Sequence, residues 1–197
     1  MDKKKLAIYL SKLKGFENLN IKLEQYSTEG DIAADILIKA QKDIVNKTIA
    51  DFGCGNGIFG IGVLLLNAKK VYFIDVDEKA IEIAKENAKN FQNAEFFCSD
   101  INMFDEKIDT VIMNPPFGVR KRKADKEFLQ KAFDLADNIY SLHKIESKSF
   151  IEKISKENNF KVECIFEYNF ILKNSYEFHK KKNYNVKVGL WILKRIK

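Results

Sequence analysis

The stretch KTIADFGCGNGIFGIGVLLLNAKKVYFIDV, residues 47–76, constrains the fold more than any other part of the chain. An apolar strand-like run is followed by a glycine-rich loop, a very apolar helical run and a second strand-like run. Two parallel strands need a crossover of this kind, so the stretch predicts a βαβ unit. Its glycines stand between strand and helix, where a backbone without side chains lets a ligand approach the helix N-terminus.

The rest of the chain continues the alternation of strand-like and helical runs, which is typical of an α/β domain. Further strands are expected at 94–100, 107–117 and 138–143, and further helices at 77–91, 126–136 and 149–158. Two long β-prone runs, 160–172 and 184–196, predict an antiparallel pair at the end of the chain, and helices are expected at 3–16 and from about 30. We therefore expect one domain over residues 1–197, with N-terminal helices in 1–45. The core, 46–197, is expected to hold a seven-stranded, mostly parallel sheet with an antiparallel C-terminal strand and helices on both faces.

The composition favours a globular protein of a reducing compartment, and we expect a cytoplasmic location. The chain has 197 residues, of which 46% are hydrophobic, and it offers neither a bilayer-spanning apolar run nor a signal-peptide core. Its three cysteines are far apart and form no CxxC or Cys/His pattern, so we expect neither a disulfide framework nor a metal site.

The charge permits a polyanionic partner. The net charge is +6, and cations cluster in the segments RKRK and HKKK. Solvated surface lysines would give the same composition, but clustering favours phosphate contacts. The candidate phosphate-contacting residues for a nucleic acid are Arg120, Lys121, Arg122, Lys123, His179, Lys180, Lys181 and Lys182.

Carboxylates at the strand ends narrow down the ligand. Gly53, Gly55 and Gly57 would also suit a dinucleotide pyrophosphate, but Asp51 at the end of the preceding strand would repel phosphate and attract an ammonium group. This favours a ligand that carries an amino acid.

Two further acidic residues are expected at the same sheet edge. Asp75 ends the second strand, where a carboxylate accepts hydrogen bonds from both ribose hydroxyls, and Asp100 follows the third strand, where it could accept the amine of an adenine. Helix capping is the alternative explanation for such residues, and it suits Asp77 better than Asp75.

The segment NPPF, residues 114–117, explains what such a ligand would be used for. Together with the glycine loop and Asp75 upstream, it resembles the (D/N)PP(Y/F) motif of the class I S-adenosylmethionine-dependent amino-methyltransferases. An adenine or amide nitrogen is a poor nucleophile because its lone pair is delocalised. The side-chain oxygen of Asn114 and the carbonyl of Pro115 can accept its two protons, Pro116 stiffens the turn, and Phe117 offers a stacking face.

The resemblance extends over nearly the whole chain. The segments LEQYST, ADFGCGNGIFGIG, FIDVDEKAIEI, DTVIMNPPFG, YSLHK and SYEFHKKK are similar to the family of small-subunit ribosomal RNA adenine-N6 methyltransferases of the methyltransferase-like protein 5 type. This implies a Rossmann-like fold, S-adenosylmethionine as methyl donor, and one adenosine of small-subunit rRNA as substrate, flipped into the NPPF pocket. It also implies, in many members, a small zinc-containing activator subunit. The implied cofactor-binding residues are Gln25, Tyr26, Thr28, Asp51, Gly53, Gly55, Gly57, Asp75, Val76, Asp100, Ile101 and Asn114.

Other functions remain open at this point. NPPY is the usual motif of N5-glutamine protein methyltransferases, and NPPF also occurs among DNA adenine methyltransferases. A non-catalytic RNA-binding protein that retains the methyltransferase fold is a third possibility, although the intact motif speaks against it. His143 and His179 are interpreted as structural or RNA-contacting residues.

Overall fold

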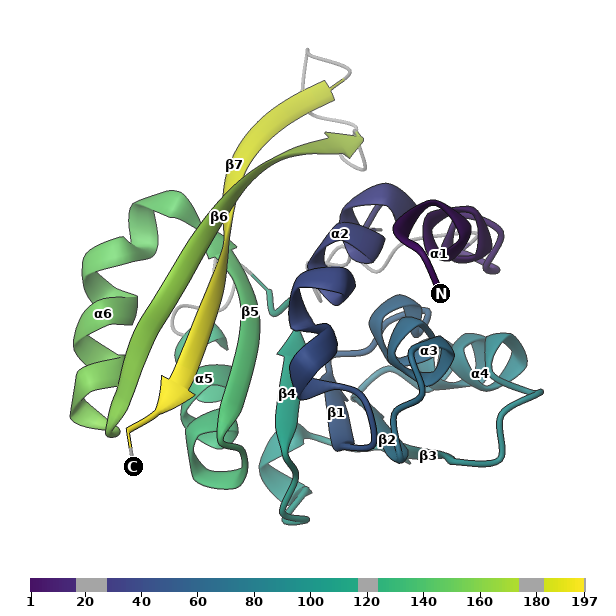
Figure 1. Ribbon diagram of the computed structural model, residues 1–197, viewed down its shortest axis with the longest axis horizontal. Coiled ribbons are helices and arrows are strands. Elements are labelled where there is room, and N and C mark those ends of the chain that lie inside the picture. Colours follow the sequence, from purple (N-terminus) through teal and green to yellow (C-terminus); the bar gives the residue numbers. More distant parts are fainter. Residues whose placement is uncertain (17–27, 117–123, 174–182, 197) are drawn as a thin grey trace.

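A computed structural model describes residues 1–16, 28–116, 124–173 and 183–196. One seven-stranded sheet has the order β3-β2-β1-β4-β5-β7-β6 and carries helices on both faces (Figure 1). The strands are β1 (Thr48–Phe52), β2 (Lys70–Asp75), β3 (Ala94–Cys98), β4 (Thr110–Met113), β5 (Asn138–Lys144), β6 (Phe160–Lys173) and β7 (Asn183–Arg195). The helices are α1 (Lys3–Leu10), α2 (Gly30–Ala40), α3 (Ile58–Leu65), α4 (Glu78–Asn87), α5 (Ala124–Leu135) and α6 (Lys148–Glu157), with short 3-10 helices η2 (Gln41–Asp43), η3 (Ile101–Met103) and η4 (Ile145–Ser147).

Strand directions agree with the sequence prediction. Strands β1 to β5 pair in parallel, whereas β7 runs antiparallel to both β5 and β6. The mostly parallel sheet with a reversed C-terminal strand is therefore confirmed. Among the helices of the described residues, none combines the length and the apolar character needed to cross a membrane.

Alternating strand residues feed two hydrophobic clusters, one on each face of the sheet. Ile49 and Phe73 pack with α1, α2, α3 and α4, whereas their neighbours Ala50 and Ile74 pack with α5 and α6. Both faces are apolar because a parallel sheet is covered on both sides. This explains why β1 and β2 appear in the sequence as continuous apolar runs.

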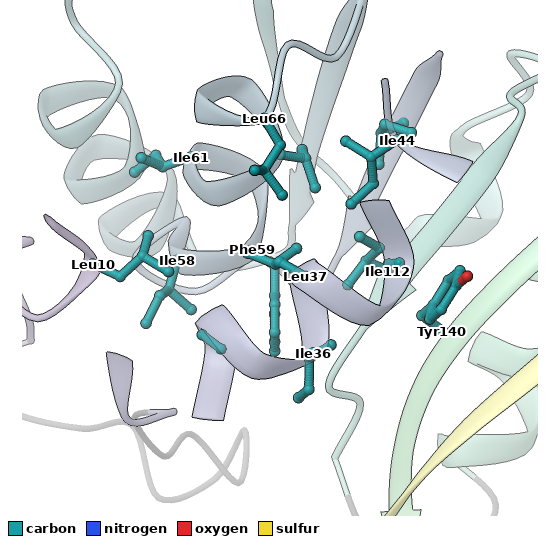
Figure 2. Close-up of a cluster of buried hydrophobic side chains, with 14 of the residues drawn as sticks. Leu10, Ile36, Leu37, Ile44, Ile58, Phe59, Ile61, Leu66, Ile112 and Tyr140 are labelled. Atoms are coloured by element: carbon teal, nitrogen blue, oxygen red, sulfur yellow. The ribbon is translucent and has the colours of Figure 1, made fainter. Parts of the chain in front are cut away.

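Helix α2 packs closely on α3, as the buried side chains in Figure 2 show. Leu37 of α2 meets Gly62 of α3, where an added Cβ would lie only 2.1 Å from the leucine Cδ1. Glycine at this position thus lets the two helices approach, and the contact fixes the height of α2 above the sheet.

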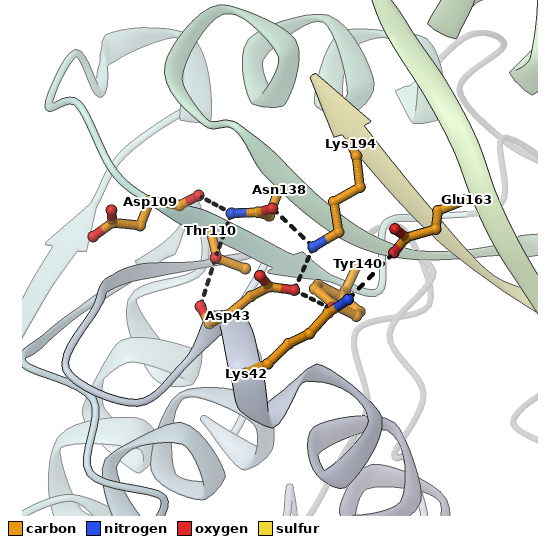
Figure 3. A network of polar contacts seen from close by, with 8 residues as sticks. All are labelled: Lys42, Asp43, Asp109, Thr110, Asn138, Tyr140, Glu163 and Lys194. Atoms are coloured by element: carbon orange, nitrogen blue, oxygen red, sulfur yellow. Dashed lines mark hydrogen bonds and ion pairs between the residues drawn. The ribbon is translucent and has the colours of Figure 1, made fainter. Parts of the chain in front are cut away.

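A buried ion pair joins the two halves of the chain at the amino-terminal edge of the parallel strands (Figure 3). The Lys194 ammonium pairs with the Asp43 carboxylate, and the two side chains are only 12% and 17% exposed. Lys194 also donates to Asn138 Oδ1 at 2.8 Å, and the hydroxyl of Tyr140 donates to Asp43 Oδ2 at 2.5 Å. The hydroxyl of Thr110 donates to the Asp43 carbonyl at 2.7 Å, so η2 is tied to β4, β5 and β7.

Replacing Lys194 by Met should destabilise the protein, because the Asp43 carboxylate would stay buried without its cation. Breaking a buried pair typically costs ~3–5 kcal/mol, and slight solvent access lowers our expectation here to about 2–4 kcal/mol. Urea unfolding measures the loss. The control Lys153→Met removes an exposed pair with Glu157 and should cost no more than about 0.5 kcal/mol, so equal losses in the two variants would contradict the prediction.

Candidate active site

The carboxyl ends of three neighbouring parallel strands form the candidate site. Strand β1 pairs with β2 on one side and with β4 on the other, with Asp51 beside Phe73 and Ile112. The glycine loop follows β1, Asp75 ends β2, and Asn114 follows β4, so the structure brings these predicted elements to one edge of the sheet. Open α/β sheets bind ligands at this edge, where the strand order reverses.

The glycine loop adopts a backbone conformation that side chains would disfavour. Gly53, Gly55 and Gly57 have φ angles of 67°, 55° and 83°. The amide of Gly57 donates to the Cys54 carbonyl at 2.8 Å, which closes the turn directly before α3. Packing also favours glycine here, because a Cβ at Gly57 would lie 3.2 Å from Ala84 and Phe73, and one at Gly53 would lie 3.2 Å from Phe128. The N-terminus of α3 follows directly, and its backbone amides can receive a ligand.

Asp75 lies deep in the edge and is already engaged by the loop. Its side chain is 9% exposed; Oδ2 accepts from the Gly55 amide at 2.9 Å, and Oδ1 accepts from the Asp77 amide at 3.0 Å. Burial raises the pKa of Asp75, while the two amides oppose the rise. A carboxylate has about four acceptor sites, so these two bonds leave capacity for two hydroxyl donors. Asp77 caps α4 by accepting from the Lys79 amide at 3.1 Å, which confirms the capping interpretation for that residue.

Asp51 is more buried and holds the start of α3. It is 2% exposed, and its Oδ2 accepts from the Gly60 amide at 2.8 Å. Burial, together with the nearby Asp75 charge, raises the pKa of Asp51 to about 7 despite that bond. Gly60 itself lies inside α3, and an added Cβ there would come within 2.1 Å of the Phe73 ring. The absence of a side chain at Gly60 therefore serves helix packing on β2, whereas we expected it to serve ligand approach.

Asp100 makes the capping interaction that was the alternative to a ligand contact. It is exposed, and its Oδ1 accepts from the backbone and side-chain nitrogens of Asn102, each at 2.9 Å, which caps η3. Val76 and Ile101, which directly follow Asp75 and Asp100, were also expected to contact the cofactor. Val76 is 54% exposed, whereas Ile101 is 5% exposed and packs in the core cluster that contains α5 and α6. Their contacts with a cofactor stay predictions.

The NPPF motif begins at the same edge. Asn114 is half-buried, and its Nδ2 donates to the hydroxyl oxygen of Thr28 at 3.1 Å, across 86 residues of chain. Pro115 is buried and Pro116 half-buried. Thr28 and Asn114, both expected at the cofactor, therefore lie in contact with each other, and their contact with a cofactor stays a prediction. The remaining predicted site residues lie outside the described part of the chain: Gln25, Tyr26, Phe117, Arg120, Lys121, Arg122, Lys123, His179, Lys180, Lys181 and Lys182.

One group of residues at the site escaped the sequence analysis. Asn87, at the end of α4, donates to the carbonyls of Lys14 and Asn56, both at 3.0 Å, and accepts from the Lys14 amide at 2.9 Å. Asn56 adds a bond of 3.2 Å to the Lys14 carbonyl. This clamp holds the segment after α1 on the glycine loop, with the Phe16 ring 3.8 Å from where a Cβ of Gly55 would be. No local pattern marks Asn87, because its partners are set by the fold.

His143 is a core residue. It is 1% exposed, its Nε2 lies 2.6 Å from Ser141 Oγ, and burial lowers its pKa to about 3, so the ring is neutral. The structural interpretation of His143 is confirmed, and a direct RNA contact is excluded. The described residues contain no group of three or more His, Cys, Asp or Glu side chains able to hold a metal ion.

Comparison with known proteins agrees with this geometry. Residues 26–144 match the family model of the methyltransferase small domain. The chain belongs to the methyltransferase small domain family. The matched residues span the glycine loop, Asp75 and the NPPF motif.

Three relatives illustrate the similarity. The rRNA N6-adenosine methyltransferase METTL5 of Danio rerio is 38% identical over 95% of this chain and 96% of its own. An uncharacterised protein of Methanocaldococcus jannaschii is 38% identical over 98% of this chain and 94% of its own. A crystal structure from Pyrococcus horikoshii, whose assignment as an RNA methyltransferase is provisional, has a TM-score of 0.94 and 40% identity over 100% of this chain and 99% of its own.

The raised pKa of Asp51 predicts pH-dependent binding of an amino-acid-bearing ligand. Below pH 7 the empty site increasingly holds a proton on Asp51, whereas an ammonium group requires the carboxylate. The affinity for S-adenosylhomocysteine should therefore fall as the pH drops below about 7, by up to about tenfold per unit. It should also fall in the alkaline range, once the ligand's α-amino group loses its proton.

Calorimetry across this pH range measures the effect. Asp51→Asn keeps an acceptor for the Gly60 amide but cannot titrate, so this control should bind weakly and lose the dependence on the acid side. Wild-type affinity that stays constant below pH 7 would remove Asp51 from the ammonium site.

Proposed function

We propose that the protein is an S-adenosylmethionine-dependent methyltransferase that modifies N6 of one adenosine in small-subunit ribosomal RNA. The observation that carries the proposal is the position of Asn114, directly after β4 and on the same sheet edge as the glycine loop and Asp75. The near full-length similarity to an enzyme named rRNA N6-adenosine methyltransferase supports RNA adenine as the acceptor. The choice of the small subunit rests on the resemblance stated above.

The described residues suit the cofactor. When bound, S-adenosylmethionine supplies an electrophilic methyl group on a sulfonium sulfur. Asp75 would accept its ribose hydroxyls, Asp51 would attract its ammonium group, and the glycine loop would let it lie against the backbone. The charge pattern is unfavourable for a pyrophosphate, because two buried carboxylates lie beside the loop.

The acceptor nitrogen is activated by dipoles. Asn114 Oδ1 and the Pro115 carbonyl would accept hydrogen bonds from the two N–H groups of the adenine amine, which turns the nitrogen lone pair toward the methyl carbon. As the carbon–nitrogen bond forms, the carbon–sulfur bond would break with its electron pair going to sulfur, and one proton of the methylated amine would pass to solvent. Such preorganised groups act without an ionisable base. This fits a site in which His143 is neutral and hydrogen-bonded in the core.

The substrate base must leave its stack to reach this edge. Extrusion costs a few kcal/mol and is easiest in single-stranded RNA. We propose that Phe117 stacks on the extruded base and that the cationic segments 120–123 and 179–182 bind phosphates. A small zinc-containing activator subunit and a cytoplasmic location remain part of the proposal.

A label-transfer survey tests the proposed function. Purified protein with methyl-labelled cofactor is offered separated small- and large-subunit rRNA, DNA and a protein extract. We expect label in small-subunit rRNA only, recovered as N6-methyladenosine after nuclease digestion. Label in protein, as methylglutamine, or in DNA would establish one of the alternative methyltransferases, and no transfer with any acceptor would favour a non-catalytic role.

Asn114→Ala should separate catalysis from cofactor binding. Removing one proton acceptor should lower the turnover rate about a hundredfold, as for other single preorganised donors or acceptors. Affinity for S-adenosylhomocysteine should change little. The exposed Asn90→Ala serves as a control and should keep the wild-type rate; a wild-type rate in Asn114→Ala would refute the role of the motif.

A further inference from the structure

Thr28 occupies an unusual position between the N-terminal helices and the catalytic motif. It precedes Glu29, the N-cap residue of α2, and Glu29 makes no side-chain capping bond. The hydroxyl oxygen of Thr28 instead accepts from Asn114 Nδ2 at 3.1 Å. Both side chains are half-buried, so this bond is partly protected from competing water.

The start of α2 is held firmly, which fixes the place of Thr28. Gly30 is buried against α1, and an added Cβ there would lie 2.3 Å from Ser11 Oγ and 2.9 Å from the Ala7 carbonyl oxygen. One turn further along, Ala33 and Ala34 are fully buried. Thr28 therefore presents its hydroxyl to Asn114 from a rigid support.

An asparagine amide needs such a partner to be useful in this reaction. Its oxygen and nitrogen ends are nearly the same size but have opposite hydrogen-bonding character. If the amide turned over, its NH₂ group would face the amine of the substrate and could accept no proton. In the orientation observed, the Thr28 hydroxyl accepts from Nδ2, so Oδ1 points the other way and the bond holds the amide plane in that position.

We propose that Thr28 is a positioning residue that holds the Asn114 amide in the observed orientation and so keeps Oδ1 toward the nitrogen that receives the methyl group. The proposal rests on the proposed role of Asn114 in methyl transfer. It assigns Thr28 to the acceptor side of the reaction, whereas the resemblance implied a contact with the cofactor.

The variant Thr28→Val removes the hydroxyl but keeps the shape of the side chain. Loss of one neutral hydrogen bond should lower kcat about three- to tenfold, while the affinity for S-adenosylhomocysteine, measured by calorimetry, stays within about twofold. Thr28→Ser restores the hydroxyl and should recover most of kcat. The same Thr→Val change at Thr48, half-buried at the opposite end of β1, should leave kcat unchanged.

A second background tests whether Thr28 acts through Asn114. If it does, Thr28→Val should have no further effect on the single-turnover rate of Asn114→Ala. An undiminished effect in that background would overturn the proposal. A weaker affinity of Thr28→Val for S-adenosylhomocysteine at unchanged kcat would also overturn it, because Thr28 would then be a cofactor contact. An increased kcat of Thr28→Val would overturn it too, because the hydroxyl would then be bonded to Oδ1 in the wild type.

The result can be separated from the fate of the proposed function. The rates are measured on whichever acceptor takes up label in the survey. Transfer to the adenine amine and transfer to the glutamine amide nitrogen both require Oδ1 to face the reacting nitrogen. Label in DNA or protein would refute the rRNA assignment, while the comparison of Thr28→Val with Thr28→Ser would still decide the role of Thr28.

Discussion

The parallel pairing of β1 with β2 and β4 is the constraint on which the site depends. Because the three strands run in the same direction, their carboxyl ends meet at one edge of the sheet. This places Asp51, Asp75 and Asn114 at the same edge, although residues 51 and 114 are 63 positions apart in the chain. The strand order reverses at β1, so the connections that follow β1 and β4 cross opposite faces of the sheet. Without this register, the glycine loop and the NPPF motif would be unrelated turns.

Placing carboxylates at this edge has an electrostatic cost, which the backbone offsets in part. Asp51 and Asp75 are both buried, and burial raises the pKa of each. The amides of Gly60, Gly55 and Asp77 donate to them, and these donors also fix α3 and the loop. The carboxylates thus hold the site together before any ligand binds, and a bound ammonium group and ribose would supply the compensation that is still missing.

Most of the fold could be predicted because its information is local. Apolar strand runs, the glycine loop at Gly53 and the long C-terminal β-prone segments each carry their own signal, and all seven strands were expected. Contacts set by packing carried none: the Asn87 clamp on Lys14 and the Lys194–Asp43 pair depend on segments brought together by the fold. Gly60 shows the same limit, because a glycine that serves a ligand and one that makes room for Phe73 look identical in sequence.

The N-terminal segment links the two halves of the candidate site. Before residue 17, Lys14 is bound by Asn87 and Asn56 at the glycine loop; after residue 27, Thr28 binds Asn114 at the catalytic motif. The chain ends that flank this stretch therefore rest on the glycine loop and on the NPPF motif. A shift of α1 and α2 relative to the sheet would disturb both contacts at once, so their packing through Gly30 and Gly62 supports the geometry of the candidate site.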